Sequence, residues 1–377
     1  MTRVEQLLAD LVAIDSTNPD LVPGAAGEGA VAAFIANWLT AAGLEVHVEE
    51  VQPGRPNIIG IARGQGGGRT LLLNGHIDTV GVTGMTAPHT PQVRDGRLYG
   101  RGAYDMKGGV AACMVAAAEA ATLGLRGDVI VTAVMDEEYA GLGTLSVAER
   151  TRADGAIVAE PTELDLVVAH RGFAWLEVET RGVAAHGSRP HLGVDAIVKM
   201  GGVLAGLDRL SRDLAGGPAH PLLGPASVHA SLISGGQELS SYPERCLLSV
   251  ERRTLPGETG ATAAAELQAI VDALAAADPA FRAEVRLGLE RAPMETPAGA
   301  AITAALQAAA TAVLGSVRAP MGVSFWTDAA SLHAAGIPTA LFGPAGAGAH
   351  AVEEWVDLAS VRACAEVYLA VARAFCQ

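Results

Sequence analysis

The sequence predicts an α/β protein in which helices flank an open β-sheet. Three short apolar runs, 70–73, 128–135 and 155–159, have the composition of buried strands, and Ala-rich stretches with helical spacing separate them. Each run is followed shortly by an imidazole or a carboxylate, as expected at the binding edge of such a sheet. From about residue 174 the pattern changes to alternating apolar and charged residues, which predicts a second, inserted α+β domain.

The remaining elements of the larger domain follow from apolar periodicity and turn residues. The expected helices are 3–14, 27–43, 108–123, 141–151, 298–314, 328–335 and 357–376. The further expected strands are 45–51, 57–62 and 339–342. Because the αβα rhythm returns late in the chain, we expect residues 1–173 and 293–377 to form one discontinuous domain.

The insertion, residues 174–292, predicts one antiparallel sheet with two helices on one face. Its expected strands are 175–180, 227–234, 245–253 and 282–290. Its expected helices are 193–213 and 258–277.

Composition limits the classes of partner. A chain of 377 residues is long enough for two domains with separate cores. Its net charge of −15 and its lack of a Lys/Arg cluster argue against nucleic acid or an anionic membrane as partner. Four scattered cysteines favour a reducing compartment, and neither a signal peptide nor a long uncharged apolar run is evident. We therefore expect a cytoplasmic protein with a small-molecule substrate.

The polar residues at the predicted strand ends each have an ordinary explanation when taken alone. His76 could be a buried histidine hydrogen-bonded to Asp78, and Asp105 could be a turn former between glycines. The other acids and the late histidine could be solvated loop residues. Together, however, they fall at the same kind of position, just past a predicted strand. The set is His76, Asp105, Glu137, Glu138, Glu160 and His350, with Asp78 behind His76.

Metal chemistry explains this set of residue types. Two divalent cations about 3.5–4 Å apart can share one carboxylate and one water. Each cation then needs a histidine and a terminal carboxylate, and a further carboxylate is needed as a base. The sequence therefore predicts a centre for two Zn²⁺ ions, for which Co²⁺ or Mn²⁺ could substitute.

Six motifs occur in order along the chain. They are Gly75-His76-Ile77-Asp78-Thr79-Val80, Gly100-Arg101-Gly102-Ala103-Tyr104-Asp105-Met106-Lys107-Gly108-Gly109, Asp136-Glu137-Glu138, Ala159-Glu160-Pro161-Thr162, Ala185-His186-Gly187-Ser188-Arg189-Pro190 and Gly348-Ala349-His350. With these motifs the chain resembles, over essentially its whole length, the di-zinc amidohydrolase and exopeptidase family of acetylornithine deacetylase, succinyl-diaminopimelate desuccinylase, carboxypeptidase G and aminoacylase. The resemblance implies a zinc-exopeptidase-like αβα catalytic domain with an inserted α+β lid and dimerisation domain.

The resemblance also implies roles for the metal-site residues. His76 and Glu160 would bind one zinc, Glu138 and His350 the other, and Asp105 would bridge the two.

Two further roles and one backbone feature come with the resemblance. Glu137 would be the general base that takes a proton from the attacking water, and Asp78 would orient His76. Similar proteins have a cis peptide bond after the bridging aspartate, here between Asp105 and Met106.

In the insertion, His186 could be a surface-turn histidine and Arg253 a solvated strand arginine. By resemblance, His186 polarises the scissile carbonyl, often in the partner subunit of a homodimer, and Arg253 holds the substrate carboxylate. Relatives often carry Asn near the place where Ser240 stands, so the substrate contact at that place differs here.

Near the end of the chain, Thr327 or Asp328 is a candidate N-cap, and the resemblance places a substrate contact there as well. The glycine-rich run around Gly346 lacks the Lys-Ser/Thr ending of a phosphate loop, and we interpret it as a substrate-carboxylate loop.

The resulting hypothesis is a zinc-dependent hydrolase that cleaves the amide bond of an N-acyl amino acid, in the manner of acetylornithine deacetylase. The alternatives are a succinyl-diaminopimelate desuccinylase-like enzyme, and a carboxypeptidase or dipeptidase. A non-catalytic binding protein on the same scaffold would need a broken ligand set, whereas this set is complete.

Overall fold

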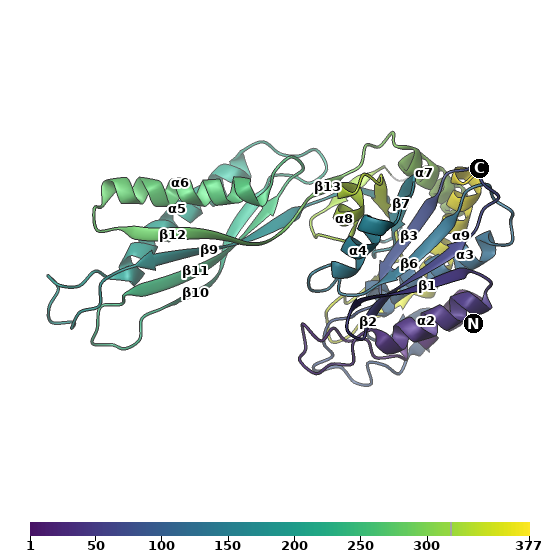
Figure 1. Cartoon of the computed structure of the whole chain (residues 1–377), viewed down its shortest axis with the longest axis horizontal. Coiled ribbons are helices and arrows are strands. Elements are labelled where there is room, and N and C mark those ends of the chain that lie inside the picture. Colours follow the sequence, from purple (N-terminus) through teal and green to yellow (C-terminus); the bar gives the residue numbers. More distant parts are fainter. Residues whose placement is uncertain (317–318) are drawn as a thin grey trace. The chain divides into compact units, whose positions relative to one another are not determined.

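A computed structural model describes residues 1–316 and 319–377 of the chain, which folds into two compact units (Figure 1). The first unit comprises Met1–Val168, Thr296–Met321 and Thr327–Gln377. The second comprises Ala169–Glu295 and Gly322–Trp326, so the predicted insertion lies inside it.

A mixed β-sheet forms the centre of the first unit, with the strand order β1-β2-β6-β3-β7-β15-β8. The four strands from β6 to β15 are parallel, and β1, β2 and β8 join antiparallel. The bounds are β1 Glu45–Gln52, β2 Arg55–Ala62, β3 Leu71–His76, β6 Val129–Val134, β7 Gly155–Val158, β8 Val167–His170 and β15 Thr339–Leu341. Two short strands, β13 (Met294–Glu295) and β14 (Met321–Val323), also pair with β8.

Helices cover both faces of this sheet. The side chains of β3 show the division, because Gly75 lies against Met106 and Val110, whereas Asn74 donates to Thr144 on the opposite face. The first face carries α1 Arg3–Val12, α2 Gly29–Ala41, α3 Gly108–Ala120, α7 Ala301–Leu314 and α9 Leu358–Phe375, which share the large apolar core. The second face carries α4 Leu142–Arg150 and α8 Ala329–Ala334.

A small antiparallel sheet joins segments that are far apart in the sequence, in the order β16-β17-β5-β4. Sequence analysis did not predict it, because its strands are only two or three residues long. The bounds are β4 Gln92–Arg94, β5 Arg97–Tyr99, β16 Gly346–Ala347 and β17 Trp355–Asp357. The sheet brings the chain just before Asp105 beside the hairpin that carries His350.

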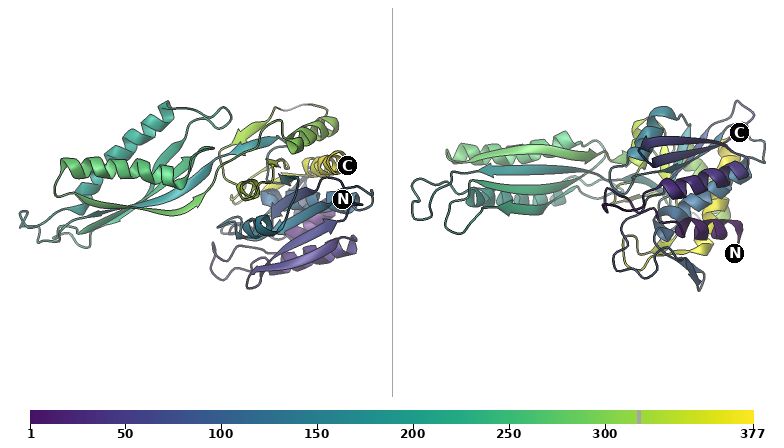
Figure 2. Two further views of the ribbon diagram at one scale, coloured as in Figure 1. Left: turned by 45° about the horizontal axis from the view of Figure 1, so that its top comes forward. Right: turned by 60° about the horizontal axis from the view of Figure 1, so that its bottom comes forward.

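The second unit is a four-stranded antiparallel sheet, in the order β10-β11-β9-β12, with two helices on one face (Figure 2). Its strands are β9 Gly172–Arg181, β10 Ser227–Gly235, β11 Arg245–Thr254 and β12 Arg282–Arg291, and its helices are α5 Ala196–Gly216 and α6 Gly260–Ala277. Strand β9 buries Ala174, Leu176 and Val178 against the helices while Trp175 and Glu177 are exposed, as alternation predicts.

The predicted fold class, an α/β domain with an α+β insertion, is thus confirmed. The predicted helices and longer strands lie within a few residues of the observed ones. Among the described residues, no helix is both long enough and apolar enough to span a bilayer.

Candidate metal centre

The end of strand β3 places His76 in the interior of the first unit. The apolar run before it is fully buried between the parallel strands β6 and β7, so the imidazole leaves the sheet at its carboxyl edge. His76 Nδ1 lies 3.0 Å from the carbonyl oxygen of Asp78 and 3.4 Å from its carboxylate. These contacts occupy Nδ1 and leave Nε2 as the nitrogen available to a metal.

Three carboxylates surround this nitrogen. His76 Nε2 lies 3.2 Å from Asp105 Oδ1, 3.9 Å from Glu137 Oε2 and 4.0 Å from Glu160 Oε1. The acids come from three different places in the sequence, after β5, β6 and β7; the strand ends before Glu137 and Glu160 were predicted, whereas β5 was not. Separations near 4 Å between ligand atoms suit a cation placed among them.

Asp105 presents its two oxygens to two different imidazoles. Oδ1 contacts His76, whereas Oδ2 lies 3.4 Å from His350 Nε2. The same His350 nitrogen lies 3.0 Å from Glu138 Oε2. Asp105 therefore lies between two donor groups, as a bridging ligand would. It lies in the segment Ala103–Lys107, where the backbone of Asp105 and Met106 is not helical, and the peptide bond between these two residues is cis, which confirms that prediction.

The donor atoms form two sets that could each hold a metal ion. In each set, all ligand atoms lie within 4.8 Å of one another. The sets are His76, Glu137 and Glu160, and His76, Asp105 and Glu138. The geometry therefore brings Glu137 among the candidate ligands as well, although the resemblance implied the role of a base.

Electrostatics shows that this cluster needs positive charge. Burial, together with neighbouring carboxylates, raises the pKa of Glu137 and of Glu160 well above the usual range. Burial opposes the charged form of Asp105 too, but hydrogen bonds from His350 and His76 outweigh it and lower that pKa. Hydrogen bonds to Asp105 and Glu138 raise the pKa of His350 to about 10. Without metal, the buried carboxylates are stabilised by protons. Divalent cations would supply the same positive charge in place of those protons, so the residues fit a metal centre.

A buried carboxylate, Glu354, holds the segment that carries Asp105. Its Oε1 accepts the backbone N–H groups of Tyr104 and Asp105, at 2.9 and 3.1 Å. Its Oε2 accepts the N–H of Gly102 at 3.0 Å and a guanidinium N–H of Arg101 at 2.6 Å. Sequence analysis missed Glu354, and its place four residues after His350 was the only available signal.

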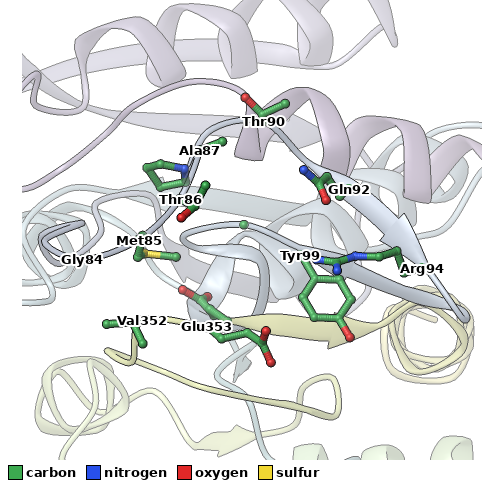
Figure 3. Close-up of a pocket in the computed structure, with 13 residues that line it drawn as sticks. Gly84, Met85, Thr86, Ala87, Thr90, Gln92, Arg94, Tyr99, Val352 and Glu353 are labelled. Atoms are coloured by element: carbon green, nitrogen blue, oxygen red, sulfur yellow. The ribbon is translucent and has the colours of Figure 1, made fainter.

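Beside this segment lies a pocket of about 300 Å³ (Figure 3). Glu354 lines it together with the loop that begins at Gly84 and the β4–β5 hairpin. Among the described residues that line it, the one basic side chain is Arg94, whose guanidinium carbon lies 4.4 Å from the centre of the Tyr99 ring. This pocket therefore adjoins the backbone that positions Asp105.

The three predicted substrate contacts of the first unit, Thr327, Asp328 and Gly346, differ in whether their polar groups already have hydrogen-bond partners within the protein. The Thr327 hydroxyl accepts the N–H of Ala329, the first residue of α8, at 3.2 Å. The N–H of Gly346 donates to Glu163 at 3.1 Å, so a side chain already occupies it.

Asp328, the third of these residues, does not cap the helix and turns inward. Its Oδ2 accepts from Thr144 at 2.7 Å, and its buried Oδ1 has no hydrogen-bond partner among the described residues. Burial raises its pKa to about 7.

The other two predicted residues, His186 and Arg253, belong to the second unit. His186 is exposed, and its Nδ1 lies 2.8 Å from the Ser188 hydroxyl. Arg253 donates to Glu251 at 2.7 Å and lies over the Phe173 ring, whereas the neighbouring Arg252 is buried in ion pairs.

Comparison with known proteins agrees with the site. The sequence pattern of peptidase family M20/M25/M40 matches residues 72–374. The chain belongs to this family. Acetylornithine deacetylase of Myxococcus xanthus is 32% identical, over 98% of this chain and 96% of that protein. A Bacillus subtilis enzyme, N-formyl-4-amino-5-aminomethyl-2-methylpyrimidine deformylase, is 30% identical, over 94% and 90% respectively.

The fold agrees too. The crystal structure of a tripeptidase from Staphylococcus aureus superposes with a TM-score of 0.81 and 20% identity, over 99% of this chain and 98% of that one. Family membership confirms the resemblance, and the protein is a metal-dependent hydrolase of amide bonds.

Glu354→Gln tests whether this carboxylate supports the metal centre. Glutamine offers one acceptor oxygen instead of two, so either the N–H groups of Tyr104 and Asp105 or those of Gly102 and Arg101 lose their acceptor and face an amide NH₂ group. We expect a loss of about 3 kcal/mol in the free energy of unfolding and a 10- to 100-fold lower metal affinity. Denaturant titration and metal competition with a chelator measure the two effects. The exposed neighbour variant Glu353→Gln is the control, and equal behaviour of the two variants would contradict the role.

Proposed function

We propose that the protein is a di-zinc deacylase that hydrolyses the amide bond of an N-acyl amino acid. The observation that carries this proposal is the position of Asp105, whose two oxygens contact His76 on one side and His350 on the other. In this proposal His76 and Glu160 would hold one Zn²⁺, Glu138 and His350 would hold the second, and Asp105 would serve as a ligand to both.

The chemistry follows from the residue types. The bound cations would polarise the scissile carbonyl and make a water acidic enough to lose a proton near neutral pH. Glu137, whose Oε2 lies 3.9 Å from His76 Nε2, would take that proton and return it to the leaving amine. Asp78 fixes the tautomer of His76 through Nδ1.

Two residues of the second unit complete the proposal. His186 would donate a hydrogen bond to the oxygen on which negative charge develops, and Arg253 would pair with the substrate carboxylate through its planar fork.

The relatives support a short acyl group. The names of the Myxococcus xanthus and Bacillus subtilis enzymes describe removal of an acetyl and a formyl group, respectively. A desuccinylase-like or dipeptidase activity remains the alternative. Both would use the same metal centre with a different substrate pocket.

The test is hydrolysis of a substrate panel with and without chelator. The panel is N-acetylornithine, N-acetylmethionine, an N-formyl aminopyrimidine, N-succinyl-diaminopimelate and a set of dipeptides. We expect about two zinc ions per chain, following the two-metal scheme, and chelator-sensitive release of free amine from an N-acetyl or N-formyl substrate. Faster turnover of the succinyl compound or of a dipeptide selects an alternative. A protein that binds no metal contradicts the proposal.

Glu137→Gln separates the role of base from that of ligand. If Glu137 is the base, the variant keeps its metal content while kcat falls by about 10²- to 10⁴-fold. Glu160→Gln serves as the comparison, because a ligand variant should lose metal along with activity. Mass spectrometry under native conditions measures the metal content of both. Loss of one metal from Glu137→Gln, to the same extent as from Glu160→Gln, would make Glu137 a ligand instead.

We further propose that the second unit forms a homodimer through strand β10, which lies at one edge of its sheet. The β10 side chains Leu232 and Ile233 are 72% and 55% exposed, and an apolar edge strand favours pairing with another chain. The double variant Leu232→Lys/Ile233→Lys should therefore sediment as a monomer. Val48→Lys is the control, since Val48 is 61% exposed on β1, the edge strand of the other unit. A dimer that persists in the double variant would rule out this edge.

A further inference from the structure

The segment between α1 and α2 reaches the carboxyl edge of the central sheet. The backbone N–H of Asn18 donates to the carbonyl oxygen of Thr79 at 2.9 Å, and the N–H of Thr79 donates to Ser16 at 3.1 Å. This pairing fixes the segment directly beside Asp78. The family pattern starts at residue 72, so it does not include Asn18.

Two buried carboxylates lie side by side at this edge. In the parallel pair β3 and β6, the last residues His76 and Val134 are in register, and Asp78 and Asp136 each follow two residues beyond the end of their strand. Both side chains are fully buried. Adjacent carboxylates in a low-dielectric interior repel each other unless donors lie between them.

The side-chain amide of Asn18 supplies those donors. Its Nδ2 lies 2.8 Å from Asp78 Oδ2 and 3.2 Å from Asp136 Oδ1. Its Oδ1 accepts the N–H of Asp20 at 2.9 Å, so the amide nitrogen is held towards the two carboxylates. Asn18 itself is fully buried.

An ion pair supports the Asp136 side of this contact. Arg55 donates to Asp136 Oδ1 at 3.2 Å and makes two hydrogen bonds of 2.7 Å to the buried Glu28 at the start of α2. Asp136 therefore has a charged donor in Arg55, which it shares with Glu28 and Asp20. Among the described residues, the hydrogen bonds to Asp78 come from neutral donors and the imidazole of His76.

Asp78 in turn contacts three candidate metal-site residues. Its Oδ1 accepts the N–H of Glu137 at 3.1 Å, its Oδ2 accepts the N–H of Glu138 at 3.2 Å, and His76 Nδ1 lies 3.4 Å from Oδ1. A shift of this one carboxylate would move an imidazole and the backbone of two acids together.

We propose that Asn18 is a positioning residue of the metal centre: its amide holds the Asp78 carboxylate against Asp136 and thereby fixes His76, Glu137 and Glu138. An amide is suited to this task because it donates two N–H groups without neutralising Asp78, which keeps its full charge for the imidazole. The inference rests on the di-metal site proposed above.

Metal affinity and metal geometry test this role directly. We expect Asn18→Ala to lower zinc affinity 10- to 100-fold in competition with a chromophoric chelator. We also expect a changed visible absorption spectrum of the Co²⁺-loaded protein, because that spectrum reports the arrangement of the ligands. Asn18→Leu, which keeps a similar volume without the N–H groups, should show the same loss if the alanine variant folds poorly.

Asn57→Ala is the matched control. Asn57 is also fully buried at this edge, and its amide bonds the backbone of Gly143 and Met135 and the side chain of Glu49; among its hydrogen bonds in the described part of the chain, none goes to Asp78. It should lower the unfolding temperature with little change in zinc affinity or Co²⁺ spectrum. An equal loss of affinity in Asn57→Ala would overturn the inference, because general loosening of the sheet edge would then explain both variants.

A double-mutant cycle with Asp78→Ala identifies the route of action. If Asn18 acts through Asp78, adding Asn18→Ala to Asp78→Ala should change zinc affinity by no more than about twofold. A full additional loss would overturn the inference.

If the parent protein binds two zinc ions and Asn18→Ala binds them as tightly, the inference fails and the proposed function stands. If the parent protein binds none, both fail.

Discussion

Crowding of carboxylates at the carboxyl edge of the central sheet is the constraint on which this structure depends. Parallel strands bring their ends to one edge, so residues that follow β3, β6 and β7 meet there whatever their distance in sequence. In this chain those residues are acids and one imidazole, and they are buried. Charge of one sign in a low-dielectric interior is stable only when donors or cations compensate it.

The protein uses two kinds of compensation in two layers. In the inner layer, His76 and His350 are the donors to the carboxylates. The pKa values of Glu137 and Glu160 are nevertheless raised, so these two imidazoles do not compensate all of the negative charge. Behind it, backbone and amide N–H groups hold the acids. Glu354 accepts three backbone N–H groups around Asp105, and Asp78 accepts two from the turn after β6. The outer layer thus sets backbone geometry, while the inner layer retains ligand atoms for metal.

Sequence reasoning predicted the inner layer and, of the outer layer, Asp78, but it missed Asn18 and Glu354 for a physical reason. Residues at strand ends can be predicted from the sequence, because a short apolar run ends just before them. His76 and Glu160 were found in that way. Asn18 and Glu354 reach the site through loop geometry, which leaves no periodic signal. The family resemblance, not periodicity, supplied the roles of Asp105 and His350, and the small sheet that joins their segments was too short to predict.

The same reasoning separates the predicted substrate contacts of the first unit. Gly346 is a glycine because a Cβ there would lie 2.4 Å from the carbonyl oxygen of Trp355, and its N–H is already bonded to Glu163. A close backbone approach therefore explains this residue without a ligand. Asp328 is different, because one buried oxygen has no partner among the described residues and the acid lies close enough to influence Glu137. A polar group that is buried without a partner lowers the stability of the fold. The presence of such a group on Asp328, beside the cluster, therefore favours Asp328 over Gly346 as a contact for a polar group of the substrate.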